Sequence, residues 1–289
     1  MKKDTKHIRA DIVNKSLNYI YKYIDTNINL EELAKLNSVS KYHFLRIFKE
    51  EVGENLFERI TAIRLQKAAN LLITNKYSTI SEISQLCGYS SHTSFIKAFK
   101  KRFFYTPTQW RKGSYKIFTK DKLNLEEKFY EEFKGLEPKI KVIPKKTCAY
   151  IRHKGYDAAL LSKLWQRLLG FAYENGIEKS TQIGIYHDNT TIIPYKDCNY
   201  IAALEVDTNF QPINSISKFE VLESLYAVFH YKGIYGDICK LISYVYHYWM
   251  PESGYEAKTL PAFAIYHKNH YLEEHDNFDL DFYVPIQVV

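Results

Sequence analysis

The stretch CGYSSHTSFIKAFKKRF (87–103) has serines near its start, aromatic residues at helical spacing, and a cluster of basic residues in its second half. At 100° per residue, Phe95 and Phe99 share one face of a helix, whereas Thr93, Lys97 and Lys100 share the opposite face. Cations on such a face can contact the phosphates and base edges of DNA. A single helix of this kind is also typical of an ordinary solvated surface helix.

The same pattern occurs twice in the first part of the chain. The segment LEELAKLNSVSKYHFLRIFK (30–49) matches ISEISQLCGYSSHTSFIKAFK (80–100), and the match aligns Arg46 with Lys97. In each copy a short helix and a tight turn precede a basic helix that opens at a serine, Ser40 in the first copy. This order of elements is typical of a helix-turn-helix unit. Two such units in one basic segment favour DNA binding over the solvated-helix alternative.

Residues 8–113 read as helices separated by short breaks. The expected helices, besides the two basic ones, cover about 8–27, 30–36, 56–75 and 79–86. A further helix should begin at TPTQW, with Thr106 as N-cap and Pro107 at the first helical position. Residues 114–136 are charged and have no clear period, so we interpret them as a linker between two domains.

Charge is distributed unevenly over the 289 residues. Residues 1–113 hold 20 Lys and Arg against 10 Asp and Glu, whereas residues 114–289 hold 20 against 23. The basic first part is suited to a polyanion. The four cysteines are far apart and form no C-x-x-C pair, and the chain has neither a secretory signal nor a membrane-spanning run. These features indicate a cytoplasmic protein without a membrane partner.

Residues 8–113, and above all ISEISQLCGYSSHTSFIKAFKKRF followed by TPTQWR, resemble the DNA-binding domain of AraC/XylS-type transcription regulators. The resemblance implies two helix-turn-helix units joined by a long helix, which place two helices in successive major-groove segments. It also implies positions that contact bases or backbone. In this chain they are Tyr42, Leu45 and Arg46 in the first unit and Thr93, Ser94 and Lys97 in the second, and we assign Lys49, Lys100 and Lys101 to phosphates.

The contacting residues differ in what they can recognise. Arg46 can make bidentate contacts to guanine, whereas Lys97 offers a point charge. Leu45 can touch a thymine methyl group or contribute nothing. Two residues depart from the family pattern, since Ser84 replaces a usual alanine and Phe104 stands where a glycine is general.

The second part of the chain also repeats. CAYIRHKG (148–155) matches AVFHYKG (227–233), and IGIYHDN (183–189) matches FAIYHKN (263–269). Each copy reads as strand, helix, strand, strand. We therefore expect an α+β domain with a pseudo-two-fold repeat and a cleft between its halves, after an all-α double helix-turn-helix domain.

Residues 137–289 resemble the GyrI-like effector-binding domain, on the basis of PKIKVIPKKTCAYIRHKG, the paired halves and the ending DFYVPI. The resemblance implies a cleft for a small molecule, and aromatic walls would favour a flat or cationic one. Ala264 stands where family members often have a glutamate, so the resemblance does not supply an acid for a cationic ligand at this position. The candidate ligand-binding residues are Tyr150, Trp165, Glu205, Tyr226, Trp249, Tyr266, Asp281 and Tyr283, although an individual aromatic residue is more often part of the core.

The sequence contains no motif for a catalytic centre, a cofactor or a metal. HKNHYLEEH (267–275) has the residue types of metal ligands without a metal-site spacing, so no metal site is expected. The prediction is a transcription regulator, not an enzyme, with promoter DNA, a small-molecule effector and RNA polymerase as partners, binding DNA as a monomer. The alternatives are a small-molecule-binding or hydrolysing protein anchored by a nonspecific DNA-binding domain, and a nonspecific nucleoid-type DNA binder.

Overall fold

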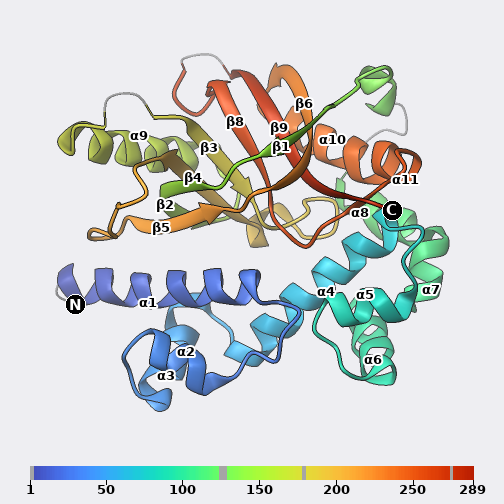
Figure 1. Cartoon of the computed structure of the whole chain (residues 1–289), viewed down its shortest axis with the longest axis horizontal. Helices are drawn as coiled ribbons and strands as arrows, with labels where there is room; N and C mark the ends of the chain where they lie inside the picture. Colours follow the sequence, from blue (N-terminus) through green and yellow to red (C-terminus); the bar gives the residue numbers. More distant parts are fainter. Residues whose placement is uncertain (1–2, 124–128, 178–179, 274–275) are drawn as a thin grey trace.

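A series of helices precedes one large antiparallel sheet in the computed structural model, which describes residues 3–123, 129–177, 180–273 and 276–289 (Figure 1). The helices of the first part are α1 (Lys3–Lys22), α2 (Leu30–Leu36), α3 (Lys41–Val52), α4 (Leu56–Thr74), α5 (Ile80–Leu86) and α6 (His92–Phe103). Among the described helices, none combines the length and the hydropathy that crossing a bilayer requires.

The segment after α6 is more helical than its sequence indicated. α7 (Pro107–Gln109) begins with a capping box between Thr106 and Gln109, as the TPTQ motif predicts. A π-helical turn (Trp110–Ser114) and α8 (Tyr115–Leu123) follow, and a short 3-10 helix (Phe129–Phe133) lies before the sheet. The expected linker 114–136 therefore contains two helices, whereas residues 124–128 lie outside the described residues.

The sheet has nine strands in the described residues, and its order shows how the two halves combine. The order is β1-β6-β9-β8-β3-β4-β2-β5, with β7 paired to β9. The strands are β1 (Lys139–Ile143), β2 (Lys146–Lys154), β3 (Gln182–Tyr186), β4 (Asn199–Glu205), β5 (Ser217–Val221), β6 (Ser224–Ile234), β7 (Tyr255–Ala257), β8 (Ala262–Lys268) and β9 (Asn277–Val288). The first half of the domain begins with β1 and the second half begins with β5. Each of these strands pairs with the other half, since β1 pairs with β6 and β5 pairs with β2.

The predicted repeat is confirmed as a pseudo-two-fold arrangement. Its axis passes between β3 and β8, where Gly184 pairs with Ala264, the residue at the matching position of the other half. Tyr186 and Tyr266, also matching residues, share a hydrogen bond of 2.9 Å between their hydroxyl groups. The space near the axis is thus filled by tyrosines rather than open.

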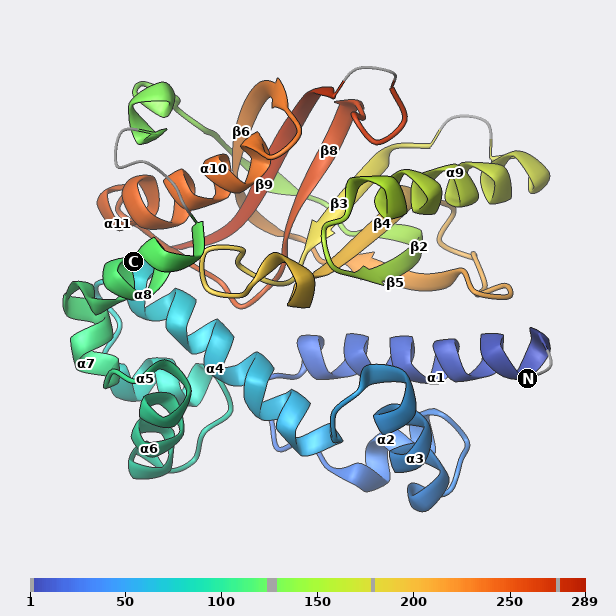
Figure 2. The same ribbon diagram turned by 180° about the vertical axis from the view of Figure 1, so that it is seen from behind.

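The two faces of the sheet are covered differently. α9 (Ala158–Glu174) and α10 (Asp237–Tyr244) lie against one face, and α1 of the helical part lies along the opposite face near β5 (Figures 1 and 2). A π-helical turn (Val245–Trp249) and α11 (Met250–Glu252) extend α10. The sheet is therefore sandwiched between its own helices and a helix of the preceding domain.

The helix-turn-helix units differ in the hydrophobic core to which they belong. Phe99 and Trp110 of the second unit form one continuous buried cluster with Phe229 and Phe282 of the sheet. The first unit, including Phe44, has a buried cluster of its own that it shares with α1. One core therefore joins the second unit to the sheet, and another joins the first unit to α1.

Candidate nucleic-acid interface and interdomain pocket

The first helix-turn-helix unit consists of α2 and α3. The Ser40 hydroxyl caps α3 by accepting a hydrogen bond from the His43 backbone N–H, and Gly53 ends the helix with a φ of 84°. Phe44, Ile47 and Phe48 are buried on its inner face. The outer face carries exposed Tyr42, Arg46 and Lys49, whereas Leu45 is half-buried and packs against the core of the unit.

The second unit repeats this design in α5 and α6. Ser91 rather than Ser90 caps α6, and Phe95, Phe99 and Phe103 are buried. Five predicted contact residues are exposed: Thr93, Ser94, Lys97, Lys100 and Lys101. Phe104 occupies the position of Gly53 in the first unit and adopts a φ of 66°, so the turn keeps the left-handed conformation without a glycine.

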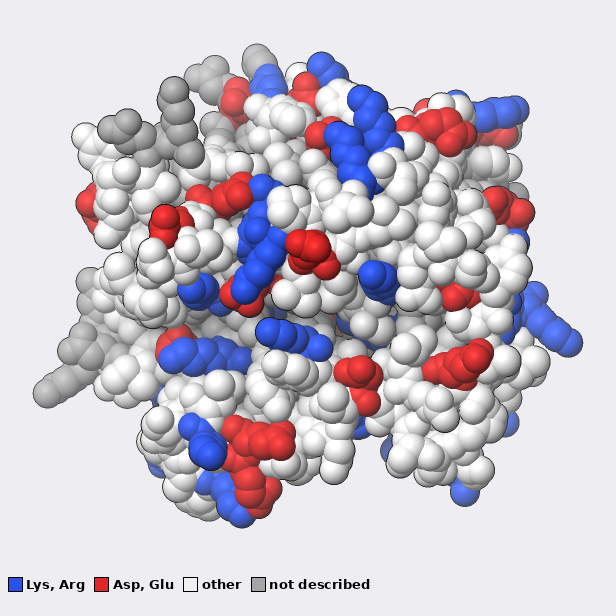
Figure 3. All heavy atoms as spheres, in the orientation of Figure 1, with Lys and Arg blue, Asp and Glu red and all other residues white. Residues whose placement is uncertain are grey.

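The outer faces of α3 and α6 are free of the sheet. Both helices lie at the edge of the molecule opposite the sheet, in two lobes separated by a notch (Figures 1 and 3). Lysine, arginine and acidic side chains are interspersed on the face that Figure 3 shows, without a single continuous basic patch. The cations that these two helices can offer to DNA are the exposed Arg46, Lys49, Lys97, Lys100 and Lys101.

α1 joins the first unit to the sheet through polar contacts. Asn18 donates hydrogen bonds from Nδ2 to the Tyr150 hydroxyl at 2.9 Å and to the Lys218 carbonyl at 3.3 Å. Arg152 donates to Asn18 Oδ1 at 2.9 Å. Tyr150, a candidate ligand residue, thus contacts α1.

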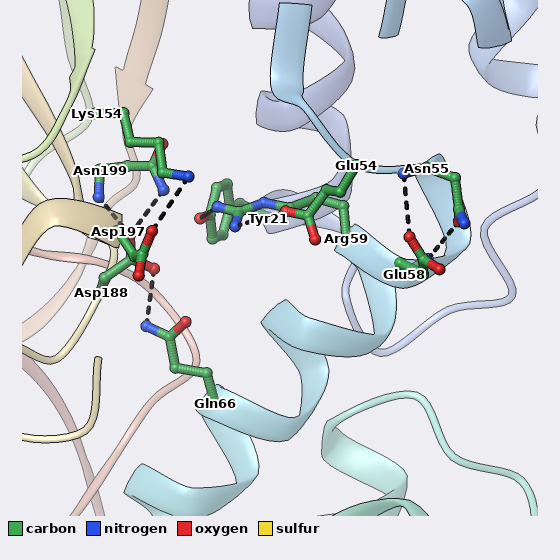
Figure 4. A network of polar contacts seen from close by, with 10 residues as sticks. All are labelled: Tyr21, Glu54, Asn55, Glu58, Arg59, Gln66, Lys154, Asp188, Asp197 and Asn199. Atoms are coloured by element: carbon green, nitrogen blue, oxygen red, sulfur yellow. Dashed lines mark hydrogen bonds and ion pairs between the residues drawn. The ribbon is translucent and has the colours of Figure 1, made fainter. Parts of the chain in front are cut away.

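A second polar network connects α4 to the loop after β3 (Figure 4). Asp188 is buried and accepts hydrogen bonds from Gln66 Nε2 at 2.8 Å and from the Asn199 side chain at 2.8 Å. On the same helix, Arg59 donates to the Tyr21 hydroxyl and pairs with Glu54, both at 3.3 Å. These contacts fix α4 against both α1 and the sheet.

A cavity of about 440 Å³ lies between α1 and the sheet. One wall comes from α1 with Tyr19 and Tyr23, and the other comes from the sheet with Phe219, Tyr226 and Phe263. Its volume is in the range of small-molecule sites, and its mixture of aromatic walls and few polar groups is typical of them. Both domains therefore contribute to a single pocket.

His187 is the polar group that stands out in this pocket. It is buried, stacks on Tyr21 with ring centroids 4.0 Å apart, and neither of its ring nitrogens has a hydrogen-bond partner among the described residues. Burial and the nearby cations of Arg152, Lys67 and Arg59 hold the pKa of His187 well below its usual value, so the ring is neutral. Burial also raises the pKa of Tyr21 to about 12. A ligand in the pocket would meet an uncharged imidazole.

The carboxylates around this pocket are already paired. Asp11 lies 2.7 Å from the Lys15 ammonium, and Glu220 lies 2.7 Å from the Lys145 ammonium. Lys22 and Lys218 also line the pocket, so lysines outnumber carboxylates there, although Asp11 Oδ1 has no hydrogen-bond partner among the described residues. This balance of charge disfavours a cationic ligand.

The structure does not bring the eight predicted ligand residues together. Trp165, Trp249 and Tyr266 pack on the face of the sheet that α9 and α10 cover. Tyr150, Tyr226 and Tyr283 belong to the buried cluster on the opposite face, and of these only Tyr226 lines the interdomain pocket. Glu205 is engaged at 2.7 Å by Lys146, and Asp281 lies between two histidines.

No sequence pattern indicates that the residues of α1 or His187 belong to this pocket. The α1 residues belong to the other domain, and no pattern in the sequence indicates that this helix lies on the sheet. His187 matches His267 in the repeat of IGIYHDN and FAIYHKN, but the repeat does not reveal that His187 is buried and His267 half exposed.

Comparison with known families identifies both parts of the chain. Residues 136–287 match the model of the GyrI-like small molecule binding domain, and residues 33–113 match a helix-turn-helix domain. The first match covers more than half of the chain, so the protein belongs to the family with a GyrI-like domain. The chain combines this domain with an N-terminal helix-turn-helix domain of the AraC type, as the resemblance predicted.

Curated relatives match a little over a third of the chain. The chain is 35% identical over 108 residues to the xylose operon regulatory protein of Escherichia coli K12, a match that covers 37% of this chain and 27% of that protein. It is 32% identical over 108 residues to the lactose operon transcription activator of Staphylococcus xylosus (36% and 38% covered). It is 34% identical over 105 residues to the probable transcription factor PqrA of Proteus vulgaris (36% and 85% covered). Apart from PqrA, the chain spans less than two fifths of these relatives.

Two solved structures are similar to parts of this chain. The C-terminal domain of AraT from Geobacillus stearothermophilus is 34% identical, with 35% of this chain and 84% of that chain covered and a TM-score of 0.34. EcmrR in complex with DNA is 12% identical, with 90% of this chain and 99% of that chain covered and a TM-score of 0.47.

Proposed function

We propose that this protein is a sequence-specific DNA-binding transcription regulator whose output is controlled by a small molecule in the interdomain pocket. The observation that carries the proposal is the double role of α1. This helix forms one wall of the pocket, and its Leu17 and Ile20 share a buried core with Phe44 and Phe48 of helix α3. A molecule that changes the position of α1 would therefore change the position of α3 relative to α6.

The walls of the pocket support an uncharged, flat aromatic effector with one hydrogen-bonding group. Tyr226 and Phe263 form the buried floor of the pocket, whereas the partly exposed rings of Tyr23 and Phe219 offer surface for stacking. His187 offers a neutral nitrogen that has no other hydrogen-bond partner among the described residues. Such a ligand would satisfy the imidazole, whose burial without a partner is otherwise unfavourable.

The further elements of the proposal rest on the relatives and on the repeat. The relatives are transcription regulators, so we assign no catalytic step to the chain and place it in the cytoplasm with promoter DNA. Two recognition helices on one chain allow it to bind DNA as a monomer, and we propose contact with RNA polymerase as the route to activation.

The DNA-binding part can be tested by selecting duplexes from a random-sequence pool. Fluorescence anisotropy over a salt series would then compare the selected duplex with a scrambled duplex of the same composition. We expect the full chain to prefer the selected duplex by at least about a thousandfold. The exposed Lys163 on α9 supplies a charge-matched control, since Lys163→Ala should leave binding unchanged. Equal affinity for both duplexes would leave only a nonspecific anchor and overturn the proposal.

The effector part can be tested by thermal shift with a panel of uncharged and cationic aromatic compounds. An uncharged compound that raises the Tm of the wild-type chain should lose this effect in Tyr226→Ala and in His187→Phe, and should change the affinity for the selected duplex. Tyr173 on α9 is 90% exposed, so Tyr173→Ala is the matched control for removal of a tyrosine. A shift that persists in both pocket variants would place the ligand elsewhere.

A further inference from the structure

Two histidines and two aspartates gather on one face of three neighbouring strands. His230 lies on β6, His267 on β8, and Asp279 and Asp281 on β9, the strand between them. His230 pairs directly with Asp281 in the register of β6 and β9. The four side chains belong to the face that carries Tyr283, beyond the interdomain pocket. They come from three strands, which the sheet brings side by side.

Asp281 holds both imidazoles. His230 Nδ1 lies 3.0 Å from Asp281 Oδ1, and His267 Nε2 lies 3.2 Å from Asp281 Oδ2. One ring nitrogen of each histidine is thus engaged by a carboxylate, which leaves the other nitrogen available. Metal-binding histidines show this same arrangement, in which an outer carboxylate fixes the orientation of the ring.

Three of these groups also lie close enough together to share an ion. His230, His267 and Asp279 each offer a ligand atom, and these atoms all lie within 4.8 Å of one another. His230 Nε2 is 3.7 Å from Asp279 Oδ1, and this oxygen is buried without a hydrogen-bond partner among the described residues. Two ligand atoms that are each about 2.1 Å from a tetrahedral zinc ion are about 3.4 Å apart. A small rotation of the rings would therefore bring the three groups to metal-binding distance.

We propose that His230, His267 and Asp279 bind a divalent first-row transition ion of the Zn²⁺ type, and that Asp281 positions the two imidazoles. Two imidazoles and one carboxylate suit such ions and do not suit Mg²⁺ or Ca²⁺, which prefer oxygen ligands. The half-exposed histidines leave the fourth coordination position accessible from solvent. Lys232 lies 2.8 Å from Asp279 Oδ2 and keeps the second oxygen occupied, so this aspartate offers a single ligand atom. The site is independent of the proposed effector.

The experiment uses the full chain after removal of metal with a chelator. Co²⁺ would be titrated and followed by its visible absorption, and Zn²⁺ would be measured by competition with a chromophoric chelator. We expect one ion per chain, displacement of Co²⁺ by Zn²⁺, and no displacement by Mg²⁺. His230→Asn and Asp279→Asn should weaken Zn²⁺ binding at least about tenfold, and Asp281→Asn about 10- to 100-fold with an altered Co²⁺ spectrum.

His153 on β2 supplies the matched control, because it is a strand histidine of the same sheet outside the cluster. His153→Asn should bind Zn²⁺ as the wild-type chain does. If one of these variants does not fold, thermal unfolding replaces the titration. Zn²⁺ should raise the Tm of the wild-type chain and should raise the Tm of His267→Asn less. Absence of saturable binding, or equal binding by the wild-type chain and the cluster variants, would overturn the proposal.

Discussion

The two helix-turn-helix units share a local design but are attached to the rest of the protein in different ways. Each basic helix begins at a serine cap, buries phenylalanines and exposes basic residues. The second unit shares its hydrophobic core with the sheet, and Glu256 accepts hydrogen bonds from Ser78 N–H at 2.8 Å and Ser78 Oγ at 2.7 Å. The first unit reaches the sheet through α1, next to the interdomain pocket.

This difference separates a fixed unit from an adjustable one. A continuous buried core resists displacement, because movement would open cavities in it. A helix that rests on the sheet through hydrogen bonds and a partly empty pocket can move at lower cost. We therefore expect an effector to act mainly on the first unit, with the second as the fixed reference.

The largest expected effect on stability comes from removing a core phenylalanine from each unit in turn, Phe99 in the second and Phe48 in the first. Phe99→Ala should lower the free energy of unfolding by about 3–5 kcal/mol and destabilise the sheet as well, because Phe99 belongs to the shared core. Phe48→Ala should cost a similar amount but loosen mainly the first unit. Hydrogen exchange resolved along the chain measures both effects. Loss of protection in the sheet with Phe48→Ala alone would contradict the distinction.

Next in size is the difference between the two recognition helices on DNA. Arg46→Ala should cost about 1–3 kcal/mol in binding and relax the preference at one base pair, because an arginine can contact guanine bidentately. Lys97→Ala should weaken binding more uniformly across sequences and reduce the salt slope by about one. Anisotropy with the selected duplex and its single-base variants distinguishes the two. Loss of folding in both variants would show that the assigned outer faces are wrong.

A third test uses the buried histidine beside α1. The pKa of His187 is held well below its usual value in the folded chain, whereas the unfolded chain takes up this proton as the pH falls below about 6.5. Protons then favour unfolding, so His187 alone should reduce the free energy of unfolding by up to about 1.4 kcal/mol per pH unit below 6.5. Denaturant titrations between pH 7 and pH 5 measure this slope.

The slope should become smaller in His187→Phe, which keeps the stacking on Tyr21. Burial also lowers the pKa of His247, near the attachment of the second unit, to about 4. His247→Phe should therefore reduce the slope in the same direction. An unchanged slope in both variants would mean that these histidines are protonated in the folded chain.

The smallest effect concerns the ends of the two recognition helices. Gly53 and Phe104 occupy matching positions with positive φ, where a glycine is less strained by roughly 1 kcal/mol. Phe104→Gly should stabilise the chain by about that amount, and Gly53→Ala should destabilise it by a similar amount. Thermal unfolding measures both. A destabilising Phe104→Gly would mean that the exposed phenylalanine ring contributes more than its backbone strain costs.

The sequence predicted the helices of the first domain closely, because their periodicity and caps are local signals. The long helix ends at Thr74, one residue before the expected end, and Ser40 and Thr106 cap the helices assigned to them. The repeat also predicted the symmetry of the sheet. Which member of a repeat-related pair is buried depends on contacts between residues that are distant in sequence. Local sequence patterns therefore do not predict it.

The pocket and the histidine cluster show why local sequence patterns did not predict these sites. The aromatic residues of the sheet have the same composition on both faces, and only the strand register assigns Tyr226 to the pocket and Tyr266 to the core. The motif HKNHYLEEH drew attention to His267, but its partners His230 and Asp279 come from other strands. Glu274 and His275 of that motif lie outside the described residues.

The exchange of first strands between the halves of the sheet has a consequence for aggregation. It places β1 at one end of the sheet, where one side of its backbone has no strand partner among the described residues and Ile140 and Val142 are exposed. Such an edge can recruit a strand from another molecule. Lys139 and Lys141 alternate with these apolar residues, and their mutual repulsion discourages two β1 edges from pairing. During synthesis β1 remains without its partner until β6, some eighty residues later, has been made. These two lysines therefore protect the nascent chain from aggregation through β1.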